Sequence, residues 1–152
     1  MIRYVLAFAL AATVLGMTAT AVDQVATTRG EQAVRAEIQT VESAASELYD
    51  EETVPPAGPA PQRIVTVEVH DQRPIRAEPE QIRFERITGA EATRVVYRVR
   101  GGPTRERTLD VPIRHADGGP VDLTRWRGEQ TLVLRLVARE SGDPIVVVDT
   151  VD

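Results

Sequence analysis

The longest continuous hydrophobic pattern lies in the first fifty residues. An apolar run from Ile2 to Val22 contains one charged residue, Arg3. Its length of about twenty residues suits a helix that crosses the hydrocarbon core of a bilayer. The pattern therefore predicts residues 1–22 as a transmembrane helix, whose insertion would be favourable by only about 2–4 kcal/mol. Such a marginal span gains stability from neighbouring helices.

Small residues form a stripe within this run. Ala12, Gly16 and Thr20 recur every fourth residue, so a second helix could approach closely there. An Ala-rich run also produces this spacing by chance, which leaves the stripe open as an interface. A cleaved signal peptide is the alternative for the whole run, because Ala19-Thr20-Ala21 resembles a cleavage site. The apolar face continues as far as Val25, which favours a retained anchor.

Residues 23–52 carry the pattern of an acidic, amphipathic helical stem. Gly30 is its weak point, where we expect the helix to restart or bend. The stem either packs on the protein's own β-domain or packs on neighbouring stems. Its apolar residues, which we call the seam, follow the four-and-three spacing of about two heptads: Val34, Ile38, Val41, Ala45 and Leu48.

The remaining residues predict a linker and then a β-domain. Residues 53–61 contain four prolines and would span about 28 Å if fully extended, either holding the β-domain away from the stem or letting it fold back. From residue 62 to 152 the apolar period becomes two, which is typical of half-buried strands. The predicted fold class is α+β, a long N-terminal helix followed by a small antiparallel β-sheet or sandwich. Strands are predicted at 63–70, 81–87, 93–100, 107–114, 131–139 and 145–151, the last two paired as a hairpin.

Composition narrows the possible functions. The chain has no Cys, which excludes disulfides, thiolate metal sites and thiol nucleophiles. It has no Lys and no Asn, and its 18 basic residues are all Arg, which favours a GC-rich, halophilic source. Residues 23–62 hold eight acids against two arginines, and this acidic stem argues against nucleic acid as a partner. With Arg3 before the span, the positive-inside rule places the N-terminus in the cytoplasm and the β-domain outside the cell.

Candidate chemistry is sparse. His70 and His115 lie in different segments, so a metal site that uses both would need a coincidence of folding. No serine has the context of a nucleophile elbow, and no Gly-rich loop joins a strand to a helix. We therefore expect no catalytic residues, no metal and no cofactor, and a protein that is not an enzyme.

The sole tryptophan lies between two cations, in Arg125-Trp126-Arg127. The structural interpretation is that Trp126 caps the core at a sheet edge while Arg125 and Arg127 face solvent. The functional interpretation is an exposed aromatic that contacts a glycan or a partner subunit.

The order of these elements resembles type IV pilin-like and pseudopilin proteins. The residues MIRYVLAFALAAT, the Pro-rich link and the strand RIVTVEV are similar to small haloarchaeal membrane proteins of this layout. The resemblance implies a non-enzymatic subunit of a type IV pilus or secretion-type surface assembly. Such a subunit would be a single-pass protein of the cell membrane, in contact with lipid, and would pack through its N-terminal helix on other pilin-like subunits or on an assembly platform.

Two departures from the pilin pattern qualify this expectation. The chain has no basic leader ending in Gly or Ala for a prepilin peptidase, and no Glu early in the apolar run. A minor, priming or accessory subunit is therefore favoured over a major pilin. The alternative is a membrane-anchored or secreted β-sandwich that acts as a binding module, and the protein would be secreted if the N-terminal run is cleaved.

Overall fold

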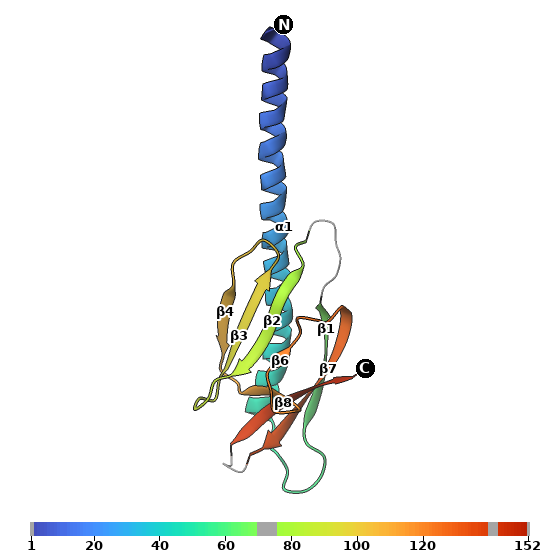
Figure 1. Ribbon diagram of the computed structural model, residues 1–152. Coiled ribbons are helices and arrows are strands. Elements are labelled where there is room, and N and C mark those ends of the chain that lie inside the picture. The colour runs from blue at the N-terminus through green and yellow to red at the C-terminus, as the bar shows by residue number, and fades with distance from the viewer. Residues whose placement is uncertain (1, 70–75, 140–142, 152) are drawn as a thin grey trace.

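The computed structural model describes residues 2–69, 76–139 and 143–151, and residues 2–22 and 151 by their backbone alone. The described chain forms a single long helix, α1 (Ile2–Glu51), and eight strands (Figure 1). The strands are β1 (Gln62–Val69), β2 (Pro79–Arg86), β3 (Thr93–Val99), β4 (Arg105–Leu109), β5 (Ile113–His115), β6 (Val121–Asp122), β7 (Gly128–Ala138) and β8 (Pro144–Val151).

The strands form two four-stranded sheets, with the orders β1-β7-β8-β5 and β4-β3-β2-β6. Every pairing between described strands is antiparallel except that of β5 with β8. The predicted hairpin of the last two strands is confirmed, with Leu134 opposite Val148. The coarse prediction of an α+β chain with a sandwich-like β-domain is therefore confirmed, although the sandwich is not purely antiparallel.

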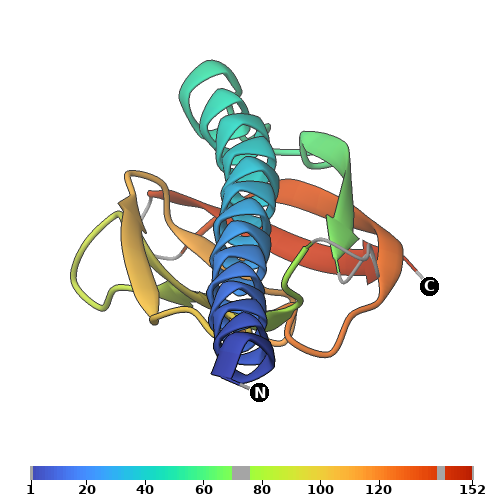
Figure 2. The same ribbon diagram turned by 90° about the horizontal axis from the view of Figure 1, so that it is seen from above.

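Helix α1 packs along the open side of the sandwich. Figure 2 shows it passing between β4 on one flank and β1 on the other, and each of these strands is the edge of its sheet. Ion pairs fasten both flanks, with Arg107 of β4 2.6 Å from Glu42 and Arg63 of β1 3.0 Å from Glu47. The helix thus closes the gap between the two sheets, and the linker folds the β-domain back along the stem.

The seam of α1 is part of the protein's own hydrophobic core. Its five residues are 0–3% exposed and belong to the same cluster as the inward side chains of both sheets, such as Val67 and Val95. Of the two alternatives for the seam, the structure has the intramolecular one. The predicted packing of this seam on neighbouring stems is therefore wrong for Val34, Ile38, Val41 and Leu48, because the strands already cover them.

The predicted restart of the helix at Gly30 is also wrong, since α1 runs through this position without a break. The reason for the glycine is a close approach by the segment that precedes β2. A Cβ on Gly30 would lie 2.5 Å from the carbonyl oxygen of Ala77. The amide of Ala77 also donates a hydrogen bond to the carbonyl of Ala26, at 3.0 Å. Because Gly30 has no side chain, the backbone of Ala77 can pack directly against the helix. The glycine lowers the local helix propensity.

Replacing Gly30 by alanine should destabilise the protein although alanine is the better helix former. The propensity gain is about 1 kcal/mol, whereas forcing a backbone apart in a packed site costs about 1–3 kcal/mol. We expect a net loss of up to about 2 kcal/mol in the free energy of unfolding, measured by urea denaturation. The control is Gln32→Ala on the exposed face of α1, which should change little. A more stable Gly30→Ala variant would contradict the close approach.

The predicted strand over residues 107–114 is two strands in different sheets. Leu109, Val111 and Ile113 are buried as the alternation predicts, but β4 ends at Leu109 and β5 begins at Ile113. Pro112 lies between them and cannot donate a ladder hydrogen bond. The chain turns there from one sheet into the other. Strand β6, with two residues, is too short for a periodic pattern and was not predicted.

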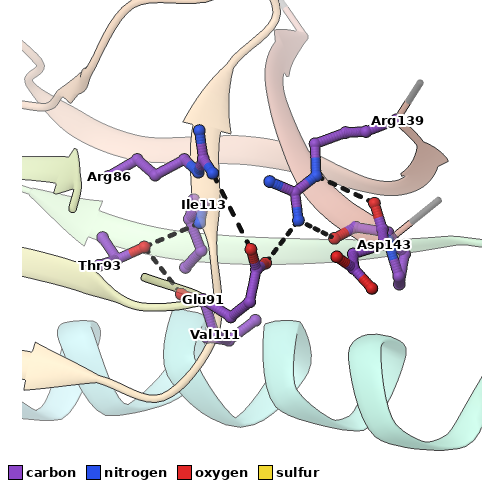
Figure 3. A network of polar contacts seen from close by, with 8 residues as sticks. Arg86, Glu91, Thr93, Val111, Ile113, Arg139 and Asp143 are labelled. Atoms are coloured by element: carbon purple, nitrogen blue, oxygen red, sulfur yellow. Dashed lines mark hydrogen bonds and ion pairs between the residues drawn. The ribbon is translucent and has the colours of Figure 1, made fainter. Parts of the chain in front are cut away.

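Thr93 holds this corner together. Its side chain is fully buried, donates to the carbonyl of Val111 at 2.7 Å and accepts from the amide of Ile113 at 2.7 Å (Figure 3). A single hydroxyl on β3 therefore satisfies the two backbone groups that the interrupted strand would otherwise leave unpaired.

Candidate functional site

The N-terminal half of α1 projects beyond the β-domain (Figure 1). Between residues 23 and 51 of α1, Gly30 is the first residue that is buried. The preceding helical residues, 2–29, have a length of about 42 Å at 1.5 Å per residue. The predicted span, with Ala12, Gly16 and Thr20, lies in the part described by its backbone alone. Among the side chains that the structure describes, no helix is both long enough and apolar enough to cross a membrane.

A groove of about 860 Å³ runs between the covered half of α1 and strand β1. Small side chains, including Ala36, Thr40 and Ser43, make up most of its helix wall, to which Gln39 and Glu47 also contribute. Its other wall is formed by residues 63–66 of β1. Ile64 stands beside it with 67% of its surface exposed, among the most exposed large hydrophobic residues of the described chain. The sequence signal was present, because Ile64 shares a strand face with the polar Thr66, but it was not recognised.

The groove also exposes part of a strand edge. The amide of Glu68 points away from β7 and donates to the Glu37 carboxylate at 3.3 Å. Because backbone groups alternate in direction along a strand, the amides of Ile64 and Thr66 point the same way. No hydrogen bond reaches either amide within the described residues, and the small helix side chains leave room beside them. The geometry suits the addition of an extended segment to β1.

Glu37 lies at one end of this strand edge, where its environment disfavours the charged carboxylate. Burial against β1 raises the pKa of the Glu37 carboxyl, and repulsion from Glu68 acts in the same direction. The hydrogen bond from the Glu68 amide and the attraction of Arg76 oppose this rise in pKa without cancelling it. The charged form of Glu37 is therefore less favourable in the folded protein than in the unfolded chain.

Replacing Glu37 by glutamine should raise stability slightly at neutral pH. A pKa raised by folding gives a contribution to stability that is complete below the unfolded value, about 4.3, and is lost as the pH rises through the folded value. Glutamine keeps an oxygen for the Glu68 amide and has no charge to lose. The variant's advantage in melting temperature should be present at pH 7 and should disappear below about pH 4. An advantage that grows on acidification would contradict this assignment.

A second polar network ties the β2–β3 loop to the β7–β8 hairpin. Glu91 lies 2.6 Å from the guanidinium of Arg139 and 3.9 Å from that of Arg86 (Figure 3). The hydrogen bond from Arg139 is the main cause that lowers the pKa of Glu91. Arg139 also donates to the carbonyl of Asp143 at 2.9 Å. The network joins two loops, and both carboxylate oxygens of Glu91 are paired with arginines. We therefore interpret this network as structural.

The residues that were weighed as candidate chemistry are the two histidines and the Arg125-Trp126-Arg127 segment. His70 lies outside the described residues, and His115 places its Nδ1 2.9 Å from Asp117 on an exposed turn. The described residues contain no group of three metal-ligating side chains. Trp126 is half-buried and packs against the core, whereas Arg125 and Arg127 are exposed. This placement agrees with the structural interpretation, in which Trp126 covers the core.

Comparison with known proteins adds a family and no activity. No curated protein matches the chain, and no solved structure does. One family model, described as a domain of unknown function (DUF7311), matches residues 1–151. Because the match covers nearly the whole sequence, the protein belongs to the DUF7311 family.

Proposed function

We propose that the protein is a non-enzymatic, pilin-like accessory subunit of a type IV pilus or secretion-type surface assembly. In this proposal residues 1–22 anchor it in the cell membrane, with the N-terminus in the cytoplasm and the β-domain outside. The partners are other pilin-like subunits or an assembly platform. The observation that carries the proposal is the shape of α1, a single helix whose C-terminal half belongs to the β-domain and whose N-terminal half projects from it (Figure 1).

The packing of the seam restricts where subunits can meet. Since the five seam residues are buried by the strands, that face of the helix has no apolar surface left for a neighbour. An assembly through α1 must therefore use the projecting half, where the stripe of Ala12, Gly16 and Thr20 is the candidate contact. By helical spacing, these three positions share one face, and small residues allow two backbones to approach closely.

Cysteine crosslinking tests this proposal in a chain that has no native cysteine. Single substitutions Ala12→Cys, Gly16→Cys and Thr20→Cys are each oxidised in native membranes. We expect a disulfide-linked dimer of the chain, or a mixed disulfide when a second subunit carries a cysteine at the same depth. Thr18→Cys is the matched control, because it lies about half a turn away from the stripe and should not crosslink.

The intact mass of the protein shows whether the apolar run, which carries the crosslinking positions, is retained. A membrane-bound product that retains the apolar run supports the anchored subunit. A soluble product that begins at Val22 would overturn it, because the candidate stripe would have been removed. Equal crosslinking at Thr18 and at the stripe would also contradict a specific helix interface.

The groove beside β1 favours a second candidate function, an anchored or secreted β-sandwich that binds an extended peptide. Exposed Ile64 and the open amides of β1 are the observations behind it. Hydrogen exchange on the protein isolated with its partners separates the two functions. Strand addition should protect the amides of Ile64 and Thr66, whereas assembly through the projecting helix should leave their exchange unchanged.

A further inference from the structure

Three arginines converge on a cavity of about 400 Å³ on the side of the sandwich away from the groove. Arg83 and Arg86 belong to β2, and Arg114 belongs to β5 of the other sheet. The turn over residues 118–120 forms another wall, and Thr88 contributes a hydroxyl-bearing side chain. The cavity thus lies where the two sheets meet, and its cations come from both.

The guanidinium groups at this cavity have unsatisfied donors. The Nε atoms of Arg83, Arg86 and Arg114 are buried and have no hydrogen-bond partner in the described chain. Arg83 Nε lies 2.9 Å from a Glu85 oxygen, but the contact is not aligned as a hydrogen bond. A buried donor without a partner is costly and calls for an explanation. A fourth such donor among the described residues, Arg63 Nε, belongs to the groove beside β1. The other three come from residues that line this one cavity, which points to an acceptor there.

The nearby carboxylates offset only part of the positive charge of these arginines, because each of them is shared with an arginine outside the cavity. Glu85, which lines the cavity, lies 2.9 Å from Arg83 through one oxygen and accepts a hydrogen bond from Arg94 at 2.8 Å through the other. Glu91 reaches Arg86 at 3.9 Å only and is held at 2.6 Å by Arg139. Arg114 has no ion pair within the described residues. The cavity wall therefore carries three arginines against a single carboxylate.

Another carboxylate lies beyond the cavity wall. The Asp122 side chain accepts a hydrogen bond from the amide of Thr124, at 2.9 Å. Burial acts to raise the pKa of Asp122, but the hydrogen bonds from Thr124 and the attraction of Arg83 and Arg125 lower it overall. Asp122 is thus committed to its own turn, and the positive excess inside the cavity remains.

We propose that this cavity binds a tetrahedral oxyanion, a phosphate or sulfate group that is either free or esterified. Such an anion offers several oxygens to the planar donors of neighbouring guanidinium groups, which match its geometry better than ammonium groups do. Bound there, it would accept from the three Nε donors and join β2 to β5 across the two sheets. The site is separate from the projecting helix and does not depend on the pilin-like function.

The test is an NMR titration of the full-length chain that follows the Nε–H signals of arginine. Sodium phosphate and sodium sulfate are added separately, with sodium chloride at equal ionic strength as the reference. We expect saturable shifts of three Nε–H signals with one or both oxyanions and none with chloride. A sugar phosphate and a sulfated sugar then separate a free ion from an esterified group, since an esterified ligand should bind more tightly than the ion alone.

Variants assign the site. Arg114→Gln should weaken binding about tenfold or more, because a charge-assisted donor is lost. Arg114→Lys keeps the charge, loses the planar fork and should also bind more weakly than the native chain. Arg98→Gln is the matched control, an exposed arginine on β3 that is paired with Glu80 at 3.1 Å, and should bind as the native chain does. If Arg114→Gln does not fold, Arg86→Gln replaces it.

Two results would overturn the proposal. One is a set of shifts that follows ionic strength alone, equal for chloride and the oxyanions. The other is binding that folded Arg114→Gln or Arg86→Gln retains at native strength, which would place the anion elsewhere on the arginine-rich surface.

Discussion

Replacing Ile38 by alanine should lower the free energy of unfolding by about 2–5 kcal/mol, as expected when a large side chain is removed from a packed core. Ile38 is 2% exposed and lies in the middle of the seam, where α1 meets both sheets. The measurement is urea unfolding at several protein concentrations. Because the seam is covered by the chain's own strands, the loss should be the same at every concentration.

Concentration dependence is the discriminating observation for this variant. If the seam packed on neighbouring stems, the loss of stability would change with protein concentration, because association is governed by mass action. Gln39→Ala is the matched control, one residue along the helix on the exposed side, and should change stability little. A small effect of Ile38→Ala would contradict the placement of the seam in the core.

Replacing Thr93 by valine should cost about 2–6 kcal/mol, although valine has nearly the shape of threonine. The hydroxyl is the hydrogen-bond partner of two buried backbone groups, the carbonyl of Val111 and the amide of Ile113. Each would be left unsatisfied, at about 1–3 kcal/mol for a buried group. Thermal and urea unfolding measure the loss, and amide exchange at Ile113 should become faster.

Thr93→Ser separates the hydroxyl from the methyl group. Serine keeps both hydrogen bonds and loses one buried methyl, so its cost should be about 0.8 kcal/mol. An equal loss of stability in the serine and valine variants would show that packing, and not the hydroxyl, holds the corner between β4 and β5.

The regular parts of the fold were predictable because their periods are strong. The alternation through Val65, Val67 and Val69 gives β1 to within a residue at either end, and the heptad spacing of the seam identifies the buried face of α1. What the seam packs against was not predictable from this pattern, since an apolar stripe is the same whether a strand or a second helix covers it.

The irregular parts depend on contacts between segments distant in sequence. Alternation through Leu109, Val111 and Ile113 indicates one strand, and only the position of Thr93, about twenty residues earlier, shows why the chain changes sheets there. From the sequence alone, Gly30 is interpreted as a helix breaker. The structure shows that it makes room for the main chain of Ala77.

The arginine cavity was equally hidden from the sequence. By alternation Arg83 falls on the outward face of its strand, Arg86 on the face of Ile82 and Phe84, and Arg114 at the end of another strand. Their donors come together only because β2 contacts β5 in the fold. No local sequence pattern predicts this contact.

The unbroken passage of α1 through Gly30 has a mechanical consequence. Any pull on the N-terminal half of the helix is carried along a continuous hydrogen-bonded rod into the sandwich, since no hinge intervenes. The load then acts parallel to the buried seam, so that the five side chains from Val34 to Leu48 resist together and not one after another. The ion pairs of Glu42 and Glu47 with the two edge strands brace the rod on both sides. The β-domain is thus built to stay attached to its helix under tension.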